Sequence, residues 1–371
     1  MEIETALQAI DRETLTPPVR KALDSETATV TDWQVAPLPA ERRNVFRFTG
    51  HACTAGKPVA WSLVLKVVGR ERTSGRREAQ ANASGLLHDL PGGLAAARCF
   101  GVEAHGDTFR IWQEEVVDEV GQPWPLDRYG LAARHLGQLN GAYLVGRPLP
   151  TGPWVLHEWI RSEVAEEEAL DVARPPRLPD HPLSRRAFPG RSVDDLFRFW
   201  QDRELYLAAL DRLPKTFGHL DAAPSNVFAR CDTSGQAQTV AIDWSHPGIA
   251  EIGHDIAPLV FFSLLDDRSD PTQAEELDRR VFAGYVSGLQ EAGWPGDPST
   301  ARFGYAASLA LRYGPSCLRR PLRYCLDESG VTWVEQVRGR PIEEVLDRFA
   351  AVHCFLLDRA DEARELLAVI H

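Results

Sequence analysis

The most informative part of the chain is the stretch FGHLDAAPSNVF at residues 217–228, which contains the pattern H-x-D-x-x-x-x-N. These three residue types rarely meet at this spacing by chance in a chain of 371 residues. A second stretch, VAIDW at residues 240–244, predicts a short apolar strand that ends in Asp243. A hairpin between the two stretches would bring Asp221, Asn226 and Asp243 together from adjacent loops.

Phosphoryl transfer is a chemistry that needs these residue types together. An Asp beside an acceptor hydroxyl can orient it and take its proton, while an Asn and a second carboxylate offer hard oxygen ligands to Mg²⁺ on nucleotide phosphates. These roles fall to Asp221, Asn226 and Asp243. The alternative is that the Asp and Asn cap turns beside Pro224, although capping does not require this spacing.

Lysine is rare in this chain, with only four among 41 basic residues. Lys66 follows the apolar run WSLVL at residues 61–65, where a buried charge needs a partner. Glu78, near the start of the next expected helix, is the candidate partner. A strand lysine paired with a helix glutamate can place an ammonium on the α- and β-phosphates of a nucleotide. A surface lysine at a strand end is the alternative.

The first third of the chain is predicted to be mainly strands. β-Branched and aromatic residues at 45–48 and 61–68 indicate an antiparallel hairpin. The other elements expected here are strands at residues 97–102 and 109–113, short helices at 4–10 and 17–23, and a helix at 76–90.

Beyond Glu115 a turn-rich stretch with Gly and Pro leads into mainly helical sequence, which places a lobe boundary here. We expect a nucleotide-binding lobe at residues 1–113 and a helical lobe, with the catalytic loop and acceptor site, at 114–371. Residues 146–191, rich in Pro and Arg, predict an irregular or inserted region. The expected helices span residues 128–144, 193–213, 255–265, 273–292, 300–313 and 342–369.

The composition is that of a globular protein, with 44% hydrophobic and 25% charged residues and a net charge of −12. Residues 1–113 hold 14 basic and 13 acidic residues, so the excess acid lies after them. This charge argues against nucleic acid as a partner and favours cationic ligands, with a solvated acidic surface as the alternative. The same two interpretations apply to an acidic run further along the chain, which is either an amine-binding patch or a solvated helix face. The run consists of Glu163, Glu166, Glu167 and Glu168.

The chain lacks the ~18 consecutive apolar residues of a membrane span, and its acidic first four residues do not resemble a signal peptide. Its six cysteines form no C-x-x-C pair, which indicates neither a zinc knuckle nor a disulfide framework. We therefore expect a cytoplasmic protein without a membrane partner. The sequence does not indicate an oligomeric state.

From about residue 25 to 310, the chain resembles the aminoglycoside phosphotransferase and choline kinase family. The resemblance is most specific at residues 219–226 and 242–244. It implies an α+β, bilobal protein-kinase-like fold, with a small β-rich N-lobe and a larger, mainly helical C-lobe.

The resemblance also implies the roles of the residues in the two motifs. Asp221 would be the catalytic base or orienting carboxylate, and His219 would brace its loop. Asn226 and Asp243 would bind magnesium. Asp255, in the segment GHDIA, would support the active site without touching substrate.

The nucleotide site implied by the resemblance lies in the first part of the chain. Lys66 would contact the phosphates of ATP or GTP and would be held by Glu78. The segment IWQEEV at residues 111–116 is similar to the strand and hinge of these kinases, so backbone groups of Glu114 and Val116 would bond the adenine.

Three features depart from the family pattern. The loop before Lys66, around residues 39–46, lacks the G-x-G-x-x-G of protein kinases, which disfavours a protein kinase more than a small-molecule kinase. Leu220 and Ala222 replace the Gly and polar residue of many relatives, a change that would narrow the acceptor pocket. Ser245 stands where a second acid is common in the family, so the sequence does not decide whether one or two metal ions bind.

The predicted function is transfer of the ATP γ-phosphoryl group to a hydroxyl of a small molecule, with an aminoglycoside-like compound or an amino alcohol favoured by the acidic charge. Two alternatives stay open. The acceptor could be a Ser or Thr of a peptide or protein, or the chain could be a non-catalytic nucleotide-binding scaffold. The variable helical lobe sets the acceptor in such proteins, so the sequence does not identify it.

Overall fold

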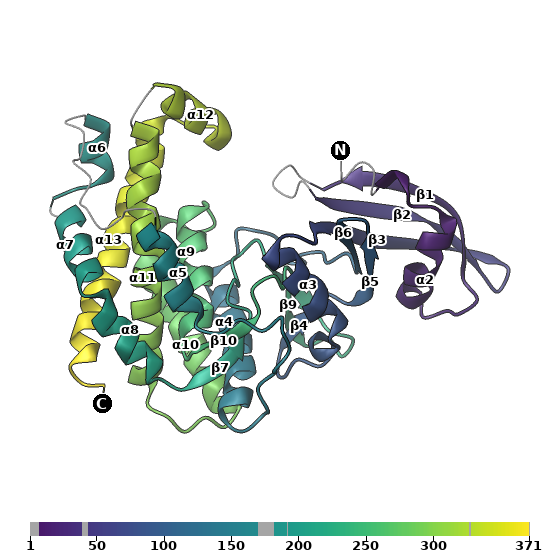
Figure 1. Cartoon of the computed structure of the whole chain (residues 1–371), viewed down its shortest axis with the longest axis horizontal. Helices are drawn as coiled ribbons and strands as arrows, with labels where there is room; N and C mark the ends of the chain where they lie inside the picture. Colours follow the sequence, from purple (N-terminus) through teal and green to yellow (C-terminus); the bar gives the residue numbers. More distant parts are fainter. Residues whose placement is uncertain (1–6, 39–43, 170–181, 191, 326–327, 371) are drawn as a thin grey trace. The chain divides into compact units, whose positions relative to one another are not determined.

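The computed structural model describes residues 7–38, 44–169, 182–190, 192–325 and 328–370. The chain divides into two compact units (Figure 1). Unit 1 comprises Met1–Glu119, Thr151–Val155 and Phe228–Pro247, and unit 2 comprises Val120–Pro150, Leu156–Val227 and Gly248–His371. Unit 1 therefore extends past the expected boundary at residue 113 and takes in two later segments, one of which carries Asp243.

A five-stranded sheet with the order β1-β2-β3-β6-β5 forms the larger part of unit 1. Its strands are β1 (Thr29–Pro37), β2 (Val45–Thr54), β3 (Lys57–Gly69), β5 (Cys99–His105) and β6 (Thr108–Gln113). Strands β2 and β3 are longer than expected, because their antiparallel ladder continues to a two-residue turn at Ala55 and Gly56. Both turn residues have positive φ, 49° and 77°, as tight hairpins favour.

One face of this sheet packs on the first helix, α2 (Arg12–Ala22). Alternate residues of β3, including Leu63 and Leu65, share a buried cluster with Leu15 and Val19 of α2. The helix begins earlier than the expected residue 17, because the Asp11 side chain accepts a hydrogen bond from the Thr14 N–H and caps it. Part of the expected helix at 4–10 lies outside the described residues.

The helix expected at residues 76–90 is shorter in the structure. Helix α3 spans Thr73–Ala83, and a separate 3-10 turn, η1, spans Leu86–His88. Gly85 between them has a φ of 80°, a left-handed conformation that ends a regular helix. The apolar residues at 79–90 keep a helical spacing across Gly85. The spacing alone therefore predicted a helix that extends too far.

A smaller, three-stranded sheet with the order β4-β9-β8 completes unit 1. Its strands are β4 (Leu94–Ala96), β8 (Val227–Cys231) and β9 (Ala237–Ala241). Strands β8 and β9 are neighbours, so the expected hairpin between the two sequence motifs is present. Strand β4 pairs with β9 in parallel, with Ala96 opposite Ala241, so the segment after β9 begins beside the end of β4.

Unit 2 is mainly helical, with a two-stranded sheet of β7 (Lys215–Gly218) and β10 (Gly248–Glu251). Its early helices are α4 (Leu126–Leu144), α5 (Trp159–Ala169), α6 (Pro182–Ala187), α7 (Ser192–Gln201) and α8 (Arg203–Asp211). Its later elements are η2 (His254–Ile256), α9 (Ala257–Leu265), η3 (Pro271–Gln273), α10 (Ala274–Glu291), α11 (Pro298–Cys325), α12 (Glu328–Arg338) and α13 (Ile342–Leu367).

Three sequence expectations about unit 2 need correction. Residues 146–191 are not wholly irregular, because α5 and α6 lie among those that the structure describes. The helix expected at 193–213 is two helices that meet at Asp202, and α12 was not expected at all. Helix α5 has little apolar periodicity, and α12 has only 11 residues, so neither presents the long apolar stripe by which α10 was found.

Helices α4 and α10 pack with unusually close backbones. A Cβ atom added at Gly288 would lie 1.9 Å from the carbonyl oxygen of Arg134, and one at Gly284 would lie 2.0 Å from that of Gly130. Only glycine fits at these two positions.

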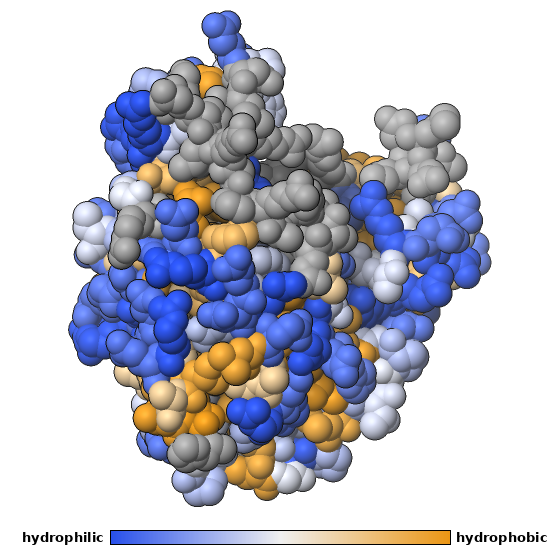
Figure 2. Space-filling view, turned by 60° about the vertical axis from the view of Figure 1, so that its left-hand side comes forward, coloured by the Kyte–Doolittle hydropathy of each residue, from blue (hydrophilic) through white to orange (hydrophobic). Residues whose placement is uncertain are grey.

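On the face of the protein shown in Figure 2, hydrophilic residues are interspersed with smaller apolar patches. Among the described residues, no helix combines the length and the apolar character needed to span a membrane.

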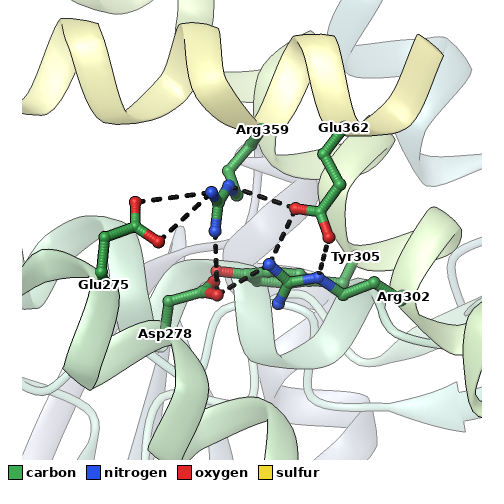
Figure 3. Close-up of polar contacts among 6 residues, drawn as sticks. All are labelled: Glu275, Asp278, Arg302, Tyr305, Arg359 and Glu362. Atoms are coloured by element: carbon green, nitrogen blue, oxygen red, sulfur yellow. Dashed lines mark hydrogen bonds and ion pairs between the residues drawn. The ribbon is translucent and has the colours of Figure 1, made fainter. Parts of the chain in front are cut away.

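A buried polar network joins α10, α11 and α13 (Figure 3). Its centre is Asp278, which accepts hydrogen bonds from the Tyr305 hydroxyl at 2.6 Å and from Arg302 and Arg359 at 2.7 and 2.9 Å. Glu362 bonds Arg302 at 2.6 Å and lies 3.3 Å from Arg359. Two guanidinium groups are thus shared among carboxylates from two helices, and the side chain of Asp278 is only 4% exposed.

We expect Asp278→Ala to destabilise the protein by roughly 3–5 kcal/mol, because it leaves two buried guanidinium groups without their shared carboxylate. The measurement is urea unfolding followed by circular dichroism. Glu276→Ala is the matched control, since Glu276 lies on the same helix but pairs with Arg279 and Arg280 at the surface. Equal losses for both variants would show that burial of the network is unimportant.

Candidate active site

The amino group of Lys66 lies between two carboxylates in unit 1. Its Nζ atom is 2.8 Å from Oε1 of Glu78 on α3 and 2.8 Å from Oδ1 of Asp243. The side chains of Lys66 and Glu78 are 14% and 1% exposed, so both charges are largely removed from water. The structure therefore contains the pair expected from sequence, and it adds Asp243 as a second partner.

Burial and charge act in opposite directions on these groups. Burial raises the pKa of Glu78 to about 7, although the Lys66 ammonium opposes this rise. Burial alone would lower the pKa of Lys66, but the charges of Glu78 and Asp243 outweigh it and raise that pKa. Lys66 is therefore held in its charged form, as a group that binds phosphate must be.

The turn after β9 presents Asp243 in a strained conformation, with a φ of 60°. Helix α3 holds this turn from a second side, because Nη1 of Arg77 donates to the carbonyl oxygen of Ser245 at 2.7 Å. Lys66 and Arg77 thus fix both the side chain and the backbone of the Asp243 turn. The Asp243 side chain remains 35% exposed, so a ligand can reach it.

The proposed hinge residues Glu114 and Val116 follow β6 in unit 1 and are half-buried. The N–H of Glu114 donates to the carbonyl oxygen of Arg98 at 2.9 Å. The Glu114 side chain accepts from the Arg98 N–H and from Arg230 at 3.0 and 3.1 Å. The backbone group that Glu114 can offer to a base is therefore its carbonyl.

The loop that carries Asp221 is fixed by a buried carboxylate of unit 2. Oδ1 of Asp255 accepts the Leu220 N–H at 2.7 Å, and Oδ2 accepts the His219 N–H at 3.3 Å. Asn140 of α4 donates to Oδ2 at 3.2 Å and to the Phe217 carbonyl oxygen at 3.0 Å. These bonds hold Leu220 at a φ of 60°, directly before Asp221.

Two neighbours orient Asp221 within its loop. The fully buried His219 accepts the Asp221 N–H at Nδ1, at 3.3 Å. The Asn226 amide nitrogen donates to the backbone oxygen of Asp221 at 3.0 Å and to its Oδ2 at 3.2 Å. The amide oxygen of Asn226 is the atom that suits a metal.

The donor chemistry fits the expected magnesium ion. Asn226 and Asp243 each offer a hard oxygen, the ligand type that Mg²⁺ prefers. Among the described residues there is no cluster of three or more His, Cys, Asp or Glu that could hold a metal alone. Asn226 lies in unit 2 and Asp243 in unit 1.

One residue beside Asp221 was missed from sequence. Nη1 of Arg312 on α11 donates to the carbonyl oxygen of Leu220 at 2.9 Å, and Nη2 lies 3.6 Å from Oδ1 of Asp221. Arg312 is 92 residues from Leu220 and belongs to no motif. No sequence signal distinguishes it from the other arginines of an arginine-rich chain.

We expect Asp255→Ala to destabilise unit 2 by roughly 3 kcal/mol, because it leaves three donors, the N–H groups of His219 and Leu220 and the Asn140 amide, without their acceptor. Hydrogen–deuterium exchange should also speed up at residues 217–223. Asp297→Ala removes an exposed carboxylate that caps α11 and serves as the control. Unchanged exchange at residues 217–223 in the Asp255 variant would contradict this account of the loop.

No protein-family model and no curated protein sequence matches the chain. Among solved structures, the chain is similar to the amicoumacin kinase hAmiN in complex with AMP-PNP, Ca²⁺ and Ami. The identity is 14% over 93% of this chain and 96% of that one, with a TM-score of 0.52. An ethanolamine kinase of Plasmodium vivax is 11% identical over 87% and 81% of the two chains, with a TM-score of 0.49. An aminoglycoside phosphotransferase of Alicyclobacillus acidocaldarius is 15% identical over 92% and 91%, with a TM-score of 0.48.

The similarity to the amicoumacin kinase extends over nearly the full length of both chains. It agrees with the β-rich unit 1 and the helical unit 2. The expected α+β architecture, with a β-rich first unit and a mainly helical second unit, is confirmed, and the chain has the protein-kinase-like fold expected from the sequence, similar to that of the amicoumacin kinase.

Proposed function

We propose that the protein is a phosphotransferase that moves the γ-phosphoryl group of ATP, or of GTP, to a hydroxyl of a small molecule. The observation that carries this proposal is the buried Lys66, held in its charged form by Glu78 and Asp243. A buried ammonium is costly, and a strand lysine held by a helix glutamate is suited to bind nucleotide phosphates. The hinge would offer the Glu114 carbonyl and the Val116 N–H to the base.

In this reaction the acceptor oxygen forms a bond to the γ-phosphorus, the bond from that phosphorus to the bridging oxygen breaks, and the nucleoside diphosphate leaves. Asp221 would orient the hydroxyl and take its proton, while His219 holds the loop in place. Asn226 and Asp243 would bind Mg²⁺, which when bound offsets charge on the phosphates. Lys66 would add a fixed positive charge at the same phosphates.

The acceptor proposed is an amine-bearing alcohol, because the residues after 113 carry the whole excess of acid. The amicoumacin kinase complex, which contains AMP-PNP and Ca²⁺, agrees with a nucleotide and a divalent cation as ligands of this fold. The two alternatives are a peptide acceptor and a scaffold without activity. The melting and ADP-release experiments distinguish both from the proposed function.

The first test is the melting temperature with ATP in the presence and absence of Mg²⁺. Nucleotide at 100 times its Kd adds ~2.7 kcal/mol, which should raise the melting temperature by a few degrees. Asp243→Ala should lose the magnesium-dependent part of the shift. Asp232→Ala is the matched control, because Asp232 caps the exposed β8–β9 turn of the same hairpin. A folded wild-type protein with no shift for ATP or GTP would refute the nucleotide site.

The second test separates catalysis from binding. Asp221→Ala should reduce phosphoryl transfer to background while the ATP-dependent melting shift stays within a degree of wild type, because Asp221 acts on the acceptor. Transfer is measured as ADP release with a panel of amino sugars, amino alcohols and Ser- or Thr-containing peptides. Full activity in the variant would remove Asp221 from the mechanism. Nucleotide binding without ADP release for every acceptor would favour the scaffold.

A further inference from the structure

Arg312 is a buried cation that none of the roles above uses. Its side chain is 9% exposed and reaches from α11 to the catalytic loop within unit 2. A buried guanidinium is costly unless its donors are satisfied, so its partners should indicate its purpose. These partners are two groups of the catalytic loop and one carboxylate of helix α5.

The first partner is the backbone of Leu220. Nη1 of Arg312 donates to its carbonyl oxygen at 2.9 Å, while Asp255 accepts its N–H at 2.7 Å. Leu220 has a φ of 60°, a conformation that bulky residues adopt only when their surroundings enforce it. Arg312 and Asp255 therefore hold the two sides of the residue that sets the direction of Asp221.

The second partner is the Asp221 carboxylate itself. Nη2 of Arg312 lies 3.6 Å from Oδ1, and the Asn226 amide donates to Oδ2 at 3.2 Å. Each carboxylate oxygen thus faces its own cationic or polar group. Rotation of the carboxylate about its Cβ–Cγ bond would break both contacts.

The third partner, Glu163 of α5, holds the far side of the guanidinium. Its Oε2 atom lies 3.3 Å from Nε of Arg312. The guanidinium carbon also lies 5.1 and 5.0 Å from the ring centres of Trp159 and Tyr313, within the range of cation–π contact. A planar group with several fixed donors suits these surroundings, whereas a lysine offers a single point charge.

We infer that Arg312 is a positioning residue that orients Asp221 for phosphoryl transfer and that Glu163 keeps Arg312 in place. The inference rests on the proposed function. It also explains why Glu163, from the acidic run, faces a buried arginine rather than solvent alone. Helices α5 and α11 are thereby coupled to the catalytic loop of the same unit.

The experiment compares three variants with wild type: Arg312→Ala, Arg312→Lys and Glu163→Gln. ADP release is measured with the best acceptor of the panel and, for ATP hydrolysis, without any acceptor. We expect Arg312→Ala to lower kcat about 100-fold, as small misplacements of reacting groups do, with the KM for ATP within about twofold of wild type. The kcat of Arg312→Lys should lie between those of Arg312→Ala and wild type. Glu163→Gln should lower kcat less than Arg312→Ala does. Arg279→Ala, at an exposed ion pair of α10, is the control for loss of an arginine.

The double variant Arg312→Ala with Glu163→Gln tests whether Glu163 acts through Arg312. If it does, the double variant should be no slower than Arg312→Ala alone, whereas an independent role of Glu163 would lower the rate further. Exchange at residues 217–223 should rise in Arg312→Ala and stay unchanged in Arg279→Ala, a readout that needs no activity. The Arg312→Lys variant keeps the test valid if the alanine variant does not fold.

The outcomes separate the two proposals. A wild-type protein that binds no nucleotide and releases no ADP refutes the proposed function, and the role of Arg312 with it. An active wild type with a wild-type rate in Arg312→Ala overturns only the role of Arg312, and additive losses in the double variant overturn the role of Glu163. Unchanged exchange at residues 217–223 in Arg312→Ala overturns the role of Arg312 whatever the activity.

Discussion

Unit 1 depends on one buried cation. Lys66 lies within β3, between the buried Leu65 and Val67, where an unpaired ammonium would be costly. Glu78 and Asp243 satisfy it, and they come from a helix and from a turn more than 150 residues further along the sequence. The pairing therefore joins two consecutive elements, β3 and α3, to a turn that is distant in the sequence. It also explains why the β8–β9 hairpin belongs to unit 1, although most of the sequence around it belongs to unit 2.

The two aspartates proposed for the reaction share a backbone feature. Asp243 itself has a positive φ, and so does Leu220, which directly precedes Asp221. Such conformations cost of order 1–3 kcal/mol each and persist only where neighbouring bonds enforce them. In both places polar side chains do so, the half-buried Arg77 beyond Asp243 and the buried Asp255 at Leu220. The strain fixes where each carboxylate points, which is what positioning catalysis requires.

The sequence allowed prediction of features that depend on local pattern. The β2–β3 hairpin, the pair of Lys66 and Glu78 and the placement of Asp243 after a strand follow from periodicity and from the cost of a buried charge. The end of α3 was misplaced, because the apolar spacing ran across Gly85. Contacts that arise from tertiary packing, such as Arg312 with Leu220, leave no local pattern. Roles in the reaction remain predictions for every site residue.

The contacts of Asp278 and Asp221 in unit 2 use arginine where the cluster of Glu78 and Asp243 in unit 1 uses lysine, and the difference follows from geometry. Lys66 pairs with two carboxylates through one compact ammonium group. Asp278 and Asp221 each lie beside a guanidinium that also contacts a second carboxylate from another helix. A planar group with five donors can satisfy several acceptors at fixed angles, so it can transmit the position of one helix to another. A change in α5 or α11 would then reach the loop of Asp221 through Arg312, which provides a physical route from two helices of unit 2 to an aspartate proposed for the reaction.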